Sequence, residues 1–136
     1  MPNKNKHIQT GAIVGGVCNF AWQLTKVYAS EDKPKSFLEA ISRVNYWEVA
    51  GFAAIGGVVF GCLPDILEPA LTPCHRGLFH SVGCGGAVFY GAFGEHTAAW
   101  DPESRMKVRS MALSYLSHLY LDSNTPSGLP LLGLRI

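Results

Sequence analysis

The stretch YWEVAGFAAIGGVVFGCLPD, residues 46–65, contributes most to the fold that the sequence predicts. It carries no charged residue between Glu48 and Asp65, and small side chains dominate it. An apolar run of this length predicts a helix over residues 46–62, and its small residues allow neighbouring helices to approach closely. The helix should end before Pro64, because proline cannot continue the helical hydrogen-bond ladder.

The rest of the chain predicts three more main helices and one short one. The main helices are expected over residues 8–28, 75–99 and 103–122. Asp101 is placed to cap the last of them. A short amphipathic helix should follow Pro34, whereas Pro69 and Pro73 should hold the dozen residues after Pro64 out of helix. The sequence therefore predicts one all-α domain over residues 1–136, with four main helices in an up-down bundle plus the short amphipathic helix.

The composition argues against some classes of protein but does not decide between a soluble and a membrane bundle. Apolar residues make up 48% of the chain and charged residues 15%, and the net charge is +1 with no long basic run, so no broad nucleic-acid-binding surface is indicated. The four cysteines form no CxxC pair, which argues against a zinc ribbon or a disulfide scaffold. The uncharged stretches 49–64 and 77–94 fall short of the roughly 20 residues that span a bilayer. Their Gly-rich faces suit a membrane bundle, a buried soluble bundle or self-association.

Histidines and aspartates fall at the ends of the predicted helices. They are His7, Asp65, His75, His80, His118 and Asp122. In an up-down bundle the starts of odd helices and the ends of even helices share one end. All six residues should then gather at that end, provided that the short helix lies across the opposite one.

These residue types predict a metal site. His118 and Asp122 are four residues apart on a helix, so both project from one face. Nitrogen and carboxylate ligands without thiolates suit a divalent ion, with zinc first and manganese or iron as alternatives. Taken alone, Asp65 would be interpreted as a residue that forms a turn. The convergence of four of the five histidines on one end of the bundle favours a metal site instead. His96 lies within an apolar segment and is interpreted as an ordinary core histidine.

Four motifs in order resemble a known family. They are Leu63-Pro64-Asp65-Ile66, His75-Arg76-Gly77-Leu78-Phe79-His80-Ser81, Tyr115-Leu116-Ser117-His118-Leu119-Tyr120-Leu121-Asp122 and Thr125-Pro126-Ser127-Gly128-Leu129-Pro130-Leu131-Leu132. Together with His7 near the N-terminus, this order resembles the inner-membrane metal-dependent hydrolases described as LexA-binding. It is similar, more distantly, to the zinc-dependent phospholipase C and single-strand nuclease group. The resemblance implies a helical protein of the bacterial inner membrane, with His and Asp metal ligands and activity on phosphoesters.

One departure from the family pattern concerns the residues after the first motif. The family commonly has a second acidic residue and then a histidine there, where this chain has Leu67 and Glu68. Glu68 is therefore a candidate substitute ligand, general base or orienting residue. Arg76 is expected to steady phosphate charge, with pairing to Glu68 or Asp65 as the alternative.

The expected function is attack of metal-activated water on a phosphoester or lipid-like substrate at a membrane. Two other classes stay open at this point. One is a membrane binding or scaffold protein with a structural metal, and the other is a soluble cytoplasmic helical phosphodiesterase or nuclease.

Overall fold

A computed structural model describes residues 4–69, 77–125 and 128–132, and all regular elements in these ranges are helical. The main helices are α1 (Lys4–Ala29), α3 (Tyr46–Ala54) with its direct continuation η1 (Ile55–Phe60), α5 (Val82–Phe93) and α6 (Pro102–Ser123). The short ones are α2 (Phe37–Ser42), α4 (Leu63–Leu67), η2 (Leu78–His80) and η3 (Glu95–Ala99). The predicted all-α class is confirmed.

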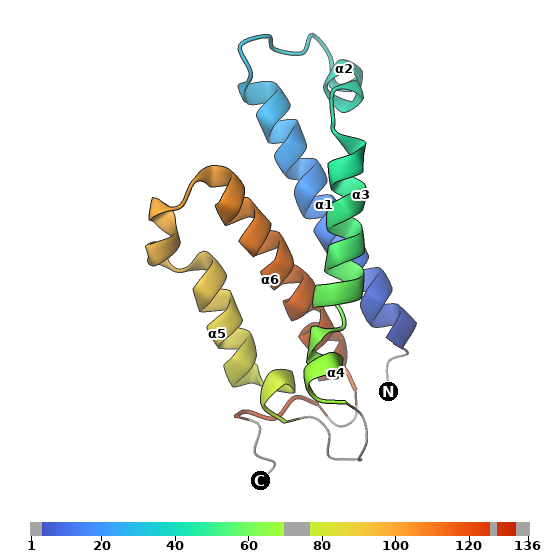
Figure 1. Ribbon diagram of the computed structural model, residues 1–136, viewed down its shortest axis with the longest axis vertical. Helices are drawn as coiled ribbons and strands as arrows, with labels where there is room; N and C mark the ends of the chain where they lie inside the picture. Colours follow the sequence, from blue (N-terminus) through green and yellow to red (C-terminus); the bar gives the residue numbers. More distant parts are fainter. Residues whose placement is uncertain (1–3, 70–76, 126–127, 133–136) are drawn as a thin grey trace.

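The main helices alternate in direction along the bundle (Figure 1). α1 and α5 run away from the end that holds α4, whereas α3 with η1, and then α6, run back toward it. α2 lies at the opposite end, as the predicted alternation requires. α1 contacts both α3 and α6, and α5 packs on α6. The starts of α1 and α5 and the ends of η1 and α6 therefore share one end of the bundle.

Two local predictions were wrong. The residues after Pro64, which Pro69 and Pro73 were expected to hold out of helix, form the end of α4, because Pro64 lies in the first turn of that helix, where a missing N–H costs no hydrogen bond. The predicted helix over 75–99 is also interrupted. Its regular part begins at Val82, capped by the Ser81 side chain, which accepts from Cys84 N at 3.0 Å, and it ends before Gly94. By contrast, Asp101 caps α6 as predicted.

Glycines allow the backbones of α1 and η1 to come into direct contact. A Cβ atom added to Gly56 would lie 2.7 Å from the Gly11 carbonyl oxygen and 2.8 Å from Ser114 Oγ. Ser114 Oγ in turn donates a hydrogen bond of 3.1 Å to the Gly11 oxygen. Three helices thus meet at a point where no side chain larger than hydrogen fits on η1, which explains the small residues of the quoted stretch.

This contact predicts opposite effects for two glycines of the same helical run. Gly56→Ala should lower the free energy of unfolding by about 1–3 kcal/mol, because the methyl group overpacks the α1–η1 contact. The matched control is Gly51→Ala in α3, where an added Cβ meets nothing within 4 Å. That substitution should stabilise the protein by about 0.5–1 kcal/mol through helix propensity. Urea unfolding followed by circular dichroism checks both values, and equal effects would contradict the packing described.

Candidate metal centre

Five of the six predicted ligands lie together at the shared end of the bundle. They are His7 of α1, Asp65 of α4, His80 of η2, and His118 and Asp122 of α6, and we call them the His–Asp cluster. The sixth, His75, lies outside the described residues. Four of the five are almost fully buried, at 0–3% exposure, whereas the Asp65 side chain is 31% exposed. The cluster therefore reaches solvent at Asp65.

His118 is the centre of the cluster. Its Nε2 lies 3.3 Å from His80 Nε2, 3.3 Å from Asp122 Oδ2 and 3.7 Å from Asp65 Oδ1. His118 belongs to two groups of potential ligands whose atoms all lie within 4.8 Å of one another. One group adds His7 and Asp122, and the other adds Asp65 and His80. This spacing suits one ion in either group.

Hydrogen bonds behind the two central rings fix which nitrogen faces the cluster. His118 Nδ1 lies 2.7 Å from the Gly61 carbonyl oxygen, and this oxygen can only accept, so Nδ1 carries the proton. His80 Nδ1 likewise donates to Glu68 Oε2 at 3.0 Å. In the neutral form of each ring, Nε2 then presents a lone pair to the cluster, which is the arrangement that metal-binding histidines adopt.

Without a cation, these atoms repel one another. The two Nε2 atoms are 3.3 Å apart, and carboxylate oxygens of Asp65 and Asp122 lie 3.2 and 3.6 Å from His80 Nε2. Four acceptors in so small a volume need a proton or a metal ion between them. The nitrogen and oxygen donors fit zinc, manganese or iron(II).

The electrostatics of His80 reflect this crowding. Burial lowers the pKa of His80, but hydrogen bonds to Asp65 and Glu68 and the charge of Asp122 raise it more, so it lies above the ordinary value. A proton on His80 thus takes the place that a metal ion would fill. Metal binding must displace that proton, which makes the affinity fall with decreasing pH.

His7 completes the buried side of the cluster. Its ring stacks on the His118 ring with centroids 3.8 Å apart, and its Nε2 lies 3.7 Å from Asp122 Oδ1. Burial of the ring, together with the nearby His118, holds the pKa of His7 below its usual value. Its Nδ1 is buried and has no hydrogen-bond partner in the described part of the chain. A buried unpaired nitrogen of this kind costs about 1–3 kcal/mol.

The remaining predicted residues lie around the cluster or away from it. Glu68 Oε2 accepts from His80 Nδ1 and from the backbone N–H groups of Gly77 and His80, which matches the orienting alternative. Arg76 lies outside the described residues. His96 follows α5 at the opposite end, and it is exposed rather than a core residue as the sequence suggested.

Sequence reasoning missed the part played by Gly61. Its carbonyl oxygen accepts from His118, and an added Cβ would lie 2.8 Å from the His7 carbonyl oxygen. The residue is held by a π-helical turn, in which Gly61 N donates to Gly56 O at 2.6 Å. A main-chain acceptor leaves no signature of its own, and the glycine-rich run around it was the available signal.

Comparisons with known proteins add no relative. No protein-family model matches this chain, and searches of curated proteins and of solved structures find no match either. The fold and the cluster together define an all-helical protein with a candidate metal site. The family resemblance described above stays a proposal.

The contact between Glu68 and the His80 ring can be tested by mutation. Glu68→Gln keeps an oxygen that can accept from His80 but removes the charge, so metal affinity should fall about 10–100-fold. Isothermal titration with zinc at neutral pH measures the change. Glu31→Gln, at an exposed position after α1, is the matched control and should leave affinity unaltered. An unchanged affinity for Glu68→Gln would contradict its orienting role.

Proposed function

We propose that this chain is a membrane-associated hydrolase that cleaves phosphoesters with the help of a divalent metal ion. The observation that carries the proposal is the convergence of His80 Nε2 and His118 Nε2 with the carboxylates of Asp65 and Asp122 at one end of the bundle. A purely structural role for these groups would be served better by apolar residues, because buried charges rarely add stability.

The exposure of Asp65 supports catalysis over a closed structural site. Structural zinc sites are usually sealed by four protein ligands, whereas catalytic sites keep a position for water or substrate. Here the Asp65 side chain is 31% exposed, whereas the other members of the cluster are buried by the surrounding helices. A divalent ion held there would lower the pKa of a water molecule toward about 7 and so supply a nucleophile at neutral pH.

Other residues of the chain would orient the ligand rings and exclude water from the site. Gly61 and Glu68 hold the rings of His118 and His80 in fixed orientations, so little reorganisation accompanies binding. Burial of His7 and Asp122 keeps water from the inner side of the site. The choice of phosphoesters rests on the family resemblance of the motifs, and zinc is the first choice of ion from the donor types.

The distribution of side chains supports a membrane environment. The largest fully buried side chains are polar apart from one proline: His80, His118, Asn19, Thr97, Pro64, Ser81, Ser110 and Ser114. Large apolar side chains lie outside instead, such as Ile13 and Val17 of α1, Val58 of η1 and Phe89 of α5, all more than half exposed. A water-soluble domain normally shows the reverse.

Charge placement along the helices agrees with this distribution. Uncharged stretches cover residues 7–25, 49–64, 77–94 and 110–121, so the acidic and basic residues lie toward the two ends of the bundle. One helical run, Tyr46–Leu67, is long and apolar enough to cross a membrane, and only 33% of its most apolar part is buried. Because a soluble core helix can also pass this test, the membrane association remains part of the proposal.

Metal content is the decisive measurement for the site. Purified protein should hold zinc at close to stoichiometric amounts, and His118→Ala combined with Asp122→Ala should lose it, because both groups of potential ligands include His118. His96→Ala is the matched control, since this exposed histidine lies at the other end of the bundle. Elemental analysis of the three proteins, together with turnover of a panel of nitrophenyl phosphoesters, tests the proposal.

The outcomes separate the competing functions. Equal metal content in all three proteins would refute the site. Metal in the wild type without turnover of any ester would favour the structural-metal alternative. Turnover that depends on zinc and disappears in the double variant supports the hydrolase.

Membrane association is tested by charging the exposed apolar surface. Val58→Lys places a cation within the candidate span at a position that is 61% exposed, so it should reduce co-flotation with phospholipid vesicles about tenfold or more. Leu38→Lys in α2, 78% exposed and outside that span, is the matched control and should float like the wild type. Wild-type protein that stays soluble without detergent and does not float would favour the soluble alternative.

A further inference from the structure

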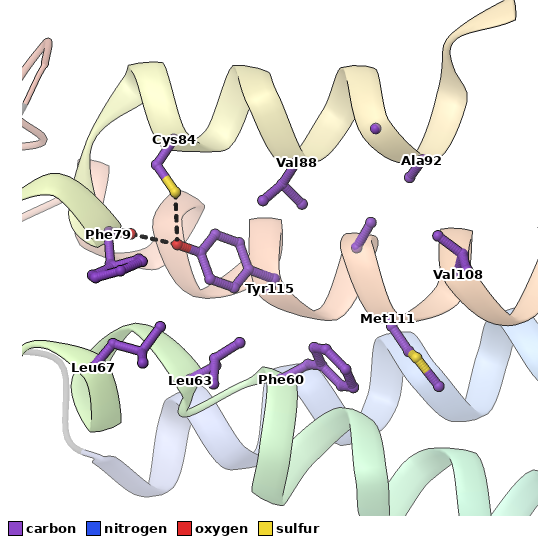
Figure 2. A pocket seen from close by; sticks show the side chains of 12 residues that line it. Phe60, Leu63, Leu67, Phe79, Cys84, Val88, Ala92, Val108, Met111 and Tyr115 are labelled. Carbon is purple, nitrogen blue, oxygen red and sulfur yellow. Dashed lines mark hydrogen bonds between the residues drawn. The ribbon is translucent and has the colours of Figure 1, made fainter. Parts of the chain in front are cut away.

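An apolar groove runs beside the His–Asp cluster. It lies between α5 and α6 on one side and η1 and α4 on the other, and encloses about 330 Å³ (Figure 2). Val88 of α5 and Met111 of α6 line it, and Phe60 of η1 and Leu63 of α4 form the facing wall. A groove of this size accommodates a hydrocarbon chain.

One end of the groove adjoins the elements that carry the metal ligands. Leu67 lies two residues after Asp65 on α4, and Phe79 directly precedes His80. In Figure 2 these two side chains lie at one end, with Tyr115, and Met111 lies toward the other. The groove is thus elongated, with its axis leading away from the cluster.

Polar atoms at this end are already engaged with the protein. Tyr115 OH donates to the Phe79 carbonyl oxygen at 2.6 Å and lies 3.3 Å from Cys84 Sγ. These bonds leave the groove walls to present hydrocarbon. A cavity of this kind favours an apolar occupant, because water inside it would find few partners.

The rim of the groove continues into the exposed apolar surface. Leu67, which lines the groove, is 45% exposed, and its neighbour Ile66 is 59% exposed. Val59, at the end of η1, is 42% exposed. A hydrocarbon chain could therefore enter sideways from a bilayer without crossing a polar barrier.

We infer that the groove binds the hydrocarbon chain of a single-chain amphiphile whose phosphate headgroup lies at the His–Asp cluster. The inference rests on the proposed function for the headgroup, and on the groove alone for the chain. The groove walls are apolar, and the Leu67 and Phe79 end lies on α4 and beside His80, on elements that also carry Asp65 and His80, so both halves of such a molecule would meet a surface of matching chemistry. Neither a peptide helix nor a soluble phosphoester would use both surfaces. The substrate class is therefore an alkyl or acyl phosphoester whose hydrocarbon chain binds within the groove.

The inference is tested by filling the groove. Val88 points into it in Figure 2, and Val88→Trp should block the chain without touching any member of the cluster. Ala87→Trp, on the exposed side of α5, is the matched control. With zinc-loaded protein, wild type and Ala87→Trp should cleave the decyl ester of nitrophenyl phosphate at least tenfold more efficiently than the butyl ester. Val88→Trp should lose this preference while still cleaving the butyl ester.

A second pair of variants guards against misfolding of Val88→Trp. Gly91 lines the groove and Gly86 does not, and an added Cβ at either meets nothing within 4 Å. Gly91→Phe should reduce the decyl preference, and Gly86→Phe should leave it unchanged. An unaltered preference in both groove variants, or no preference in the wild type, would overturn the inference.

A binding readout separates this inference from the proposed function. Decyl phosphate with a diazirine at the end of its chain should label the far end of the groove, at Met111 or Val108, when irradiated with the wild-type protein. Val88→Trp should abolish this labelling, and Ala87→Trp should retain it. Labelling without turnover would refute the hydrolase but keep the chain site. Labelling of the wild-type protein outside the groove, or labelling that Val88→Trp leaves unchanged, would refute the inference.

Discussion

Backbone contact between α1 and η1 is the constraint on which the candidate site depends. Gly11 and Gly56 approach so closely that neither accommodates a Cβ, and Ser114 of α6 closes the same point with a hydrogen bond. One turn further along, this contact brings Gly61 against the backbone of His7. Because the Gly61 carbonyl oxygen also accepts a hydrogen bond from His118 Nδ1, the packing of small residues fixes the orientation of a candidate ligand ring.

Much of this arrangement could be predicted from the sequence, because helix direction alone determines which ends meet. The parity of four helices was enough to expect His7, Asp65, His80, His118 and Asp122 at one end. What could not be predicted depends on main-chain geometry. The π-helical turn before Gly61 and the short helix α4, with Pro64 in its first turn, depend on tertiary packing that the glycine-rich run and the proline do not specify by themselves. The orienting role of Glu68 was one of three alternatives, and the contact with His80 Nδ1 that supports it is visible only in the fold.

The interior of the bundle differs from an ordinary hydrophobic core, because small and polar side chains fill much of it. Small residues between helices bury little apolar area, so the usual hydrophobic contribution to stability is reduced. Large apolar side chains lie on the surface and along the groove instead. In a bilayer this distribution is not a liability, since lipid solvates the outer side chains while close packing and serine hydrogen bonds hold the helices together.

A bound cation would link the helices to one another at the end of the bundle that holds the cluster. The His–Asp cluster joins α1, α4, η2 and α6, elements drawn from both ends of the chain. Without an ion, its converging acceptors favour separation of these elements. With one, the same groups become cross-links, so binding and folding at this end are coupled. The headgroup site and the wall of the groove share α4, since Asp65 lies between Leu63 and Leu67. An ion that fixes α4 would therefore also fix the wall against which a hydrocarbon chain packs.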